Sequence, residues 1–142
     1  MRALIDTCVI IDVLQNREPF SKDAQTLFLA AANNQFIGCI TAKAATDIYY
    51  LMHRFTHDDT ASRAVLNKLF LLFSLLDTAG MDCRHAVLSP VADFEDAVMI
   101  ETAIRTESDC IVTRNVHDYT KSKVPVYTPA EFLKLLEAEL AD

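Results

Sequence analysis

Residues 2–14, RALIDTCVIIDVL, place a carboxylate between two apolar stretches. Ala3–Ile5 is apolar, the run ends at Asp6, and a second apolar stretch follows Thr7. No Lys or Arg occurs in the next four residues, and an unpaired carboxylate is costly to bury. The first run predicts a short buried strand and Thr7–Leu14 a helix, so Asp6 is expected at a strand end. One alternative is that Asp6 only caps the following helix.

The amino-acid composition limits the classes of protein to which the chain can belong. The 142 residues, 51% of them apolar, predict a single globular domain over residues 1–142. The net charge of −7 argues against a simple nucleic-acid-binding module, which should be basic, but it is compatible with an enzyme whose acidic site first recruits metal ions. No apolar run approaches the ~20 residues of a membrane span, and the N-terminus lacks signal-peptide features. We therefore expect a cytoplasmic protein with no membrane association.

The four cysteines are dispersed and show no zinc-ligand spacing, so we expect each to be a small apolar side chain. Strands and helices alternate along the rest of the chain. The expected strands are 3–5, 35–41, 75–77, 109–113 and 124–128. The expected helices are 7–14, 21–33, 42–55, 58–73, 82–88, 91–106 and one starting at Pro129.

This alternation predicts an α/β fold with three layers, in which helices cover both faces of a central, mainly parallel sheet of four to five strands. Ligands bind at the carboxyl ends of the strands in open sheets of this kind. Asp6 follows the first strand, and Asn115 through Asp118 follow the strand at 109–113. Both segments are therefore expected at the site.

Two expected helices carry acids beside their apolar stripes. Asp47 is three residues after Ala44 and four before Leu51, and Asp93 and Asp96 extend the stripe of the helix at 91–106. Solvated acids are expected on the opposite face.

Simpler explanations exist for some of these acids. Asp47 has possible ion-pair partners in Lys43 and Arg54, and Asp93 fits a helix cap. We expect Asp12 to have no special role and Glu95 to lie on a solvated face.

Convergence of these acids would call for a cation. Two carboxylates about 4 Å apart repel by roughly 4 kcal/mol at an effective dielectric constant of 20. Hard divalent ions such as Mg²⁺ and Mn²⁺ prefer such oxygen ligands, and they activate water for phosphodiester hydrolysis. A bound metal would neutralise Asp6 at its apolar strand end.

Three motifs resemble the PIN domain family, in its branch of VapC-like ribonuclease toxins. They are LIDTCVIIDVL at 4–14, DFEDAVMIETAI at 93–104 and DCIVTRNVHDY at 109–119. Their order and spacing cover nearly the whole chain. The resemblance implies a three-layer fold with a parallel sheet and Mg²⁺- or Mn²⁺-dependent hydrolysis of RNA, which leaves a 5′-phosphate and a 3′-hydroxyl.

The resemblance also implies roles for individual residues. The catalytic and metal-binding acids would be Asp6, Asp47, Asp96 and Asp118. The supporting residues would be Thr7, Asp93, Thr113 and Asn115. The basic cluster after the strand at 109–113 is a candidate to bind the RNA backbone, with a solvated basic turn as the alternative; it consists of Arg114, His117, Lys121 and Lys123. The chain departs from the family at Asp47, where Glu is usual, and at Asn115, where many members carry Asp.

The family further implies an RNA substrate, a small antitoxin partner and a homodimer, with residues 52–73 as a candidate dimer surface. The departures at Asp47 and Asn115 keep open a catalytically weak PIN fold that acts as a binding or regulatory module. A phosphatase with Asp6 as nucleophile is disfavoured because Cys8 occupies the position of its usual second Asp. The only glycines, Gly38 and Gly80, do not form a nucleotide-binding turn.

Overall fold

The computed structural model describes residues 1–142. The strands are β1 (Arg2–Ile5), β2 (Ile37–Thr41), β3 (Ser74–Leu76), β4 (Cys110–Val112) and β5 (Val126–Tyr127). The helices are α1 (Thr7–Leu14), α2 (Ser21–Ala32), α3 (Ala42–Thr56), α4 (Asp59–Leu72), α5 (Gly80–Val87), α6 (Phe94–Arg105), α7 (Pro129–Leu140) and the short 3-10 helix η1 (Val116–Tyr119).

The five strands form one sheet in the order β3-β2-β1-β4-β5, and every neighbouring pair is parallel. The central strand β1 pairs Leu4 with Cys39 on one side and with Ile111 on the other. The predicted α/β class and its parallel sheet are confirmed. The continuous apolar sequence of β1 follows from this position, because a central parallel strand is buried on both faces.

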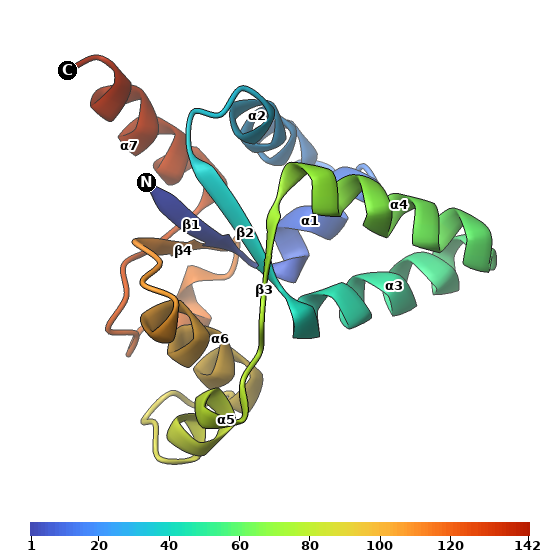
Figure 1. The fold of residues 1–142 in the computed structure, drawn as a ribbon. Helices are drawn as coiled ribbons and strands as arrows, with labels where there is room; N and C mark the ends of the chain where they lie inside the picture. The colour runs from blue at the N-terminus through green and yellow to red at the C-terminus, as the bar shows by residue number, and fades with distance from the viewer.

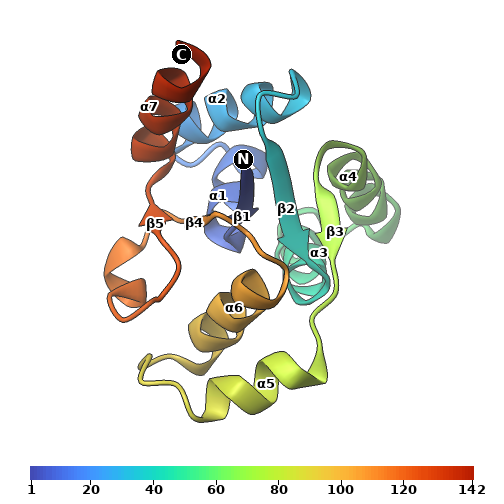
Figure 2. The same ribbon diagram turned by 60° about the vertical axis from the view of Figure 1, so that its left-hand side comes forward.

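Side chains of β1 alternate between two hydrophobic cores. Ala3 and Ile5 belong to the larger core, and Leu4 belongs to the smaller one. Helices α1, α2, α3, α4 and α7 contribute to the larger core, whereas α6 contributes Ile100 and Ala103 to the smaller one and α5 packs against α6 (Figures 1 and 2). The sheet is therefore the middle of three layers.

Helix starts follow from local capping. The Thr41, Asp58 and Asp93 side chains accept backbone N–H groups at the starts of α3, α4 and α6. Thr128 and Glu131 form a capping box at the start of α7, where Pro129 occupies the first helical position.

Predicted and observed elements agree in order and type, with ends that shift by up to three residues. Two features differ from expectation. Residues 116–119 form η1, which the sequence pattern did not indicate, and Cys83 is exposed on α5 rather than buried. No helix has the length and apolar character that crossing a membrane requires.

Candidate active site

Asp6 lies at the carboxyl end of β1, at the N-cap position of α1, but its side chain makes no capping hydrogen bond. Its Oδ2 instead accepts hydrogen bonds from Thr113 Oγ1 at 2.8 Å and from the Tyr119 hydroxyl at 3.3 Å. Both donors follow the neighbouring strand β4, so the parallel pairing of β1 with β4 brings them to Asp6. The capping alternative for Asp6 is therefore wrong.

The segment after β4 is ordered around Thr113. The Thr113 hydroxyl donates to Asp6 and accepts the backbone N–H of Asn115 at 3.1 Å. The chain then turns into η1, which places Tyr119 in the smaller core with its hydroxyl at the site. Burial raises the pKa of Tyr119, and the charges of Asp6 and Asp96 raise it further, so the phenol stays protonated and can only donate to an ionised acid.

Asp96 lies in the first turn of α6 and lines the same pocket as Asp6. Burial raises its pKa to about 6, and the negative charges of Asp93, Asp6 and Asp118 act in the same direction. The Tyr119 hydroxyl partly opposes this rise. The charge of Asp6 therefore raises the pKa of Asp96, and the Tyr119 hydroxyl lies beside both carboxylates.

Asp93 has the structural role that its spacing also suggested. Its Oδ1 accepts the backbone N–H of Asp96 at 3.1 Å and so caps α6. Its charge adds to the negative potential at Asp96 at the same time.

Asp47 reaches the site from α3, but its carboxylate is already paired with the ammonium group of a lysine. Lys43 Nζ lies 2.5 Å from Asp47 Oδ2 and 2.9 Å from Glu95 Oε1. The Lys43 alternative for Asp47 is thus observed, and exposed Glu95 is engaged in the same ion pair. A small pocket of about 60 Å³ has Asp6, Asp47 and Asp96 in its lining, together with Thr7, Lys43 and Tyr119.

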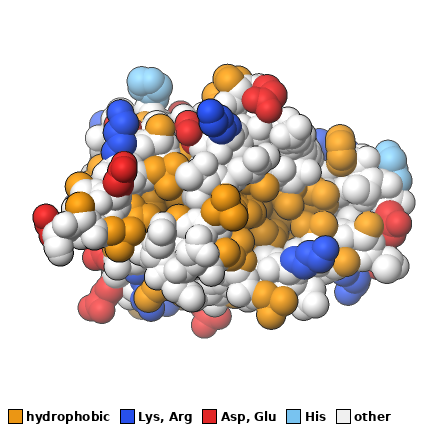
Figure 3. Space-filling view, turned by 90° about the horizontal axis from the view of Figure 1, so that it is seen from above, with side chains coloured by type: hydrophobic (Ala, Val, Ile, Leu, Met, Phe, Trp, Pro, Cys, Tyr) orange, Lys and Arg blue, Asp and Glu red, His pale blue; other side chains and the backbone are white.

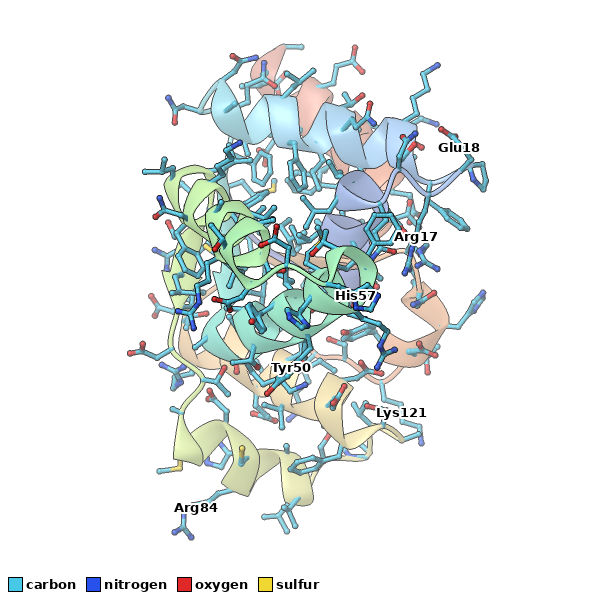
Figure 4. All side chains as sticks on the ribbon, turned by 90° about the vertical axis from the view of Figure 1, so that its right-hand side faces the viewer. Arg17, Glu18, Tyr50, His57, Arg84 and Lys121 are labelled. Atoms are coloured by element: carbon cyan, nitrogen blue, oxygen red, sulfur yellow. The ribbon has the colours of Figure 1, made fainter.

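Asp118, His117 and Lys121 line a different hollow of about 180 Å³, together with Asp93. Lys121 is exposed and extends from the segment that follows η1 (Figure 4). Asp118 therefore acts on Asp96 through its charge but does not line the pocket of Asp6.

Arg114 is turned away from the acidic pocket. Its Nε lies 2.8 Å from Asp12 Oδ2, and the guanidinium carbon is 4.5 Å from the centre of the Phe20 ring. The Asp12 side chain is only 2% exposed, so this ion pair ties the segment after β4 to α1. Asp12, to which the sequence assigned no role, is thus a buried structural partner.

The candidate metal site offers two carboxylates rather than a larger cluster of ligands. No group of three or more His, Cys, Asp or Glu side chains is arranged to hold a metal ion. Two carboxylates, those of Asp6 and Asp96, share the pocket without a basic partner, and Mg²⁺ is commonly held by one or two carboxylates with waters in its other positions. The residues present therefore fit such an ion.

Sequence reasoning missed Tyr119 and the ion pair between Lys43 and Glu95. Tyr119 belongs to the motif at 109–119, but nothing in the pattern indicated a 3-10 helix that turns its hydroxyl toward Asp6. The bridge from Lys43 to Glu95 spans 52 residues of sequence and depends on how α3 and α6 meet.

The three-layer fold has a parallel sheet at its centre and carboxylates near the strand ends, so the chain is an α/β protein with an acidic site. A family model for the PIN domain matches residues 2–117, and the chain belongs to this family. No curated protein is matched by the sequence.

Several solved structures share the fold. VapBC-1 from nontypeable Haemophilus influenzae is 14% identical, with a TM-score of 0.67 over 92% of this chain and 99% of that chain. A toxin–antitoxin complex from Klebsiella pneumoniae is 20% identical, with a TM-score of 0.66 over 89% and 97%. VapBC2 from Rickettsia felis, bound to a DNA fragment from its promoter, is 12% identical, with a TM-score of 0.66 over 89% and 97%.

Proposed function

We propose that the protein is an Mg²⁺- or Mn²⁺-dependent endoribonuclease. The observation that carries this proposal is the pairing of Asp6 with Asp96 in one pocket, where the pKa of Asp96 is raised to about 6. Asp96 is mostly ionised at neutral pH, and the one basic residue of the pocket, Lys43, pairs with Asp47 and Glu95 instead. A divalent cation bound there would offset this charge and would activate water for the hydrolysis of an RNA phosphodiester.

Asp6 and Asp96 would hold the ion, with Asp47 of the same pocket as a further candidate ligand, whereas Asp118 lies outside the pocket and would act only through its charge. When bound, the ion would activate water and stabilise the charge that develops on the phosphate oxygens. Thr113 and Tyr119 fix the orientation of the Asp6 carboxylate through their hydroxyl groups. Because Thr113 also binds the backbone of Asn115, the segment after β4 holds this orientation.

We further propose an antitoxin partner, since the structures with the same fold include toxin–antitoxin complexes. The expected homodimer stays a proposal as well. Large apolar side chains are exposed on α3 and α4, including Phe55 at 64% and Leu71 at 85%. Tyr50 also projects from α3 (Figure 4), and apolar side chains gather across the face seen from above (Figure 3).

A second candidate function is a binding or regulatory module without efficient catalysis. The contact that favours it is the ion pair between Lys43 and Asp47, because a neutralised Asp47 contributes less to cation binding. This candidate predicts RNA or protein binding without metal-dependent cleavage.

The test is cleavage of a labelled RNA panel with Mn²⁺, Mg²⁺ or EDTA, by the natural protein and by the Asp6→Asn, Asp96→Asn double variant. An Asp59→Asn variant on exposed α4 is the matched control for loss of a carboxylate. We expect metal-dependent cleavage by the natural protein and the control, but not by the double variant. Equal cleavage by all three would identify a contaminating ribonuclease, and no cleavage would favour the binding module.

A further inference from the structure

A second cavity adjoins the acidic pocket. It has a volume of about 150 Å³ and lies where α5 and α6 approach the start of α3. The two hollows share the residues Thr41, Lys43, Glu95 and Met99. The two hollows are therefore neighbours, and the Lys43–Glu95 ion pair belongs to the lining of both.

The walls of this cavity are mostly apolar. Phe94, Val98 and Met99 of α6 line it, and Phe94 is 50% exposed although it is a large aromatic residue. Unstacked RNA bases are held in proteins by stacking on such aromatic rings. An exposed phenylalanine at the mouth of an apolar hollow provides that surface next to the carboxylates.

Three threonines line the same cavity, and the hydroxyl group of Thr102 is already engaged as a donor within the protein. Thr78 Oγ1 accepts the backbone N–H of Lys43 at 3.2 Å, and Thr41 Oγ1 accepts that of Ala44 at 3.0 Å. Each of these last two threonines uses its oxygen as an acceptor in these bonds. Its hydroxyl hydrogen remains available to donate to a carbonyl or ring nitrogen on the edge of a base.

Lys43 is the only basic residue that lines either hollow. Arg84, on nearby α5, points away from the rest of the molecule (Figure 4). An RNA backbone approaching a protein of net charge −7 needs a cation at its phosphate, and Lys43 stands where the two hollows meet.

We propose that this cavity is a subsite for one nucleotide of the RNA, with its base against Phe94, its phosphate at Lys43 and the adjoining phosphodiester at Asp6 and Asp96. The proposal rests on the proposed function and adds to it the contact that selects the cleavage position. The base contributes affinity and sequence preference, while Lys43 exchanges carboxylate partners for a phosphate. Glu95 would then be released toward solvent.

The first experiment measures binding of short fluorescent oligoribonucleotides by anisotropy with Mg²⁺ present. All proteins carry Asp6→Asn so that cleavage does not interfere. Phe94→Ala removes the proposed stacking surface, and Phe55→Ala removes an exposed phenylalanine of α3 outside the cavity. We expect Phe94→Ala to weaken binding about tenfold, and Phe55→Ala to leave it within about twofold.

A second measurement locates the base. Cys83 lines the cavity and is the one exposed cysteine, so its alkylation, followed by mass spectrometry, reports on access to the cavity. We expect bound RNA to slow this alkylation in the Asp6→Asn protein and much less in its Phe94→Ala derivative.

Equal affinities of the two phenylalanine variants, or Cys83 alkylation that RNA does not slow, would overturn the subsite while metal-dependent cleavage by the natural protein still stood. RNA that neither binds nor is cleaved would overturn both the subsite and the ribonuclease.

Discussion

Asp96 is the acidic residue whose surroundings most oppose its charge. Its pKa is raised to about 6 by burial and by Asp93, Asp6 and Asp118. A carboxyl group whose pKa is higher in the folded than in the unfolded state stabilises the fold at low pH. That contribution is complete below about pH 4 and is lost as the pH rises through about 6.

Asp96→Asn should therefore stabilise the metal-free protein at pH 8 but have little effect at pH 4. We expect a gain of about 1 kcal/mol at pH 8, because the carboxylate is partly solvent-exposed and the helix dipole favours an acid in the first turn. Urea unfolding at both pH values, with EDTA present, measures this difference. The exposed Glu137→Gln on α7 is the control, and a loss of stability for Asp96→Asn at pH 8 would contradict the assignment.

Gly38 of β2 lies close to the ring of a buried phenylalanine, Phe73. A Cβ atom at Gly38 would lie 2.6 Å from Cδ1 of Phe73, whose ring is buried and packs edge-on against Phe28. Gly38→Ala should cost about 1–3 kcal/mol of stability through overpacking. Gly80→Ala is the matched control, because no atom lies within 4 Å of its added Cβ. Equal unfolding midpoints for the two variants would contradict this, because they would show that β2 accommodates the added methyl group without a loss of stability.

Among the elements, α1 and the segment after β4 are joined by the ion pair of Asp12 with Arg114. The Asp12 side chain is 2% exposed and that of Arg114 24%. Removing the arginine leaves a buried carboxylate without its counter-charge. The segment that carries Thr113 and Tyr119 would lose its connection to α1 at the same time.

Arg114→Ala should destabilise the protein by about 3 kcal/mol in urea unfolding. The control is Arg63→Ala, which breaks an exposed ion pair with Asp59 and should cost less than about 1 kcal/mol. The Asp12→Ala, Arg114→Ala double variant should recover part of the loss. Similar small losses for both arginine variants would contradict a structural role for Arg114.

The elements themselves were predictable because their signals are local. Continuous apolar runs predict buried parallel strands at Ala3–Ile5 and in β4. The start of α7 is indicated by Pro129, with Thr128 before it and Glu131 after it. The 3-10 helix η1 was not predictable, since a single turn of four residues has no periodicity to detect.

The site was predictable only as far as topology determines it. Asp6 and the segment after β4 had to meet, because their parallel strands are neighbours. The contact of Tyr119 with Asp6 spans 113 residues, and that of Arg114 with Asp12 spans 102, so both depend on side-chain packing that no local pattern encodes.

At the scale of the whole molecule, the proposed activity on RNA requires this acidic chain to recruit a cation. The net charge of −7 repels phosphate, and the pocket of Asp6 and Asp96 concentrates that charge at the strand ends. A divalent ion bound there would lower the local negative potential and stabilise the fold by mass action, by about 2.7 kcal/mol at a hundred times its Kd.

Calorimetric titration of Mn²⁺ into the metal-free protein tests this account most directly. The natural protein and Asp59→Asn should bind Mn²⁺ with the same affinity, and the Asp6→Asn, Asp96→Asn variant should show no saturable heat. Urea unfolding of the double variant confirms that it is folded. Unchanged Mn²⁺ binding by the double variant would contradict the assignment of Asp6 and Asp96 as the cation site.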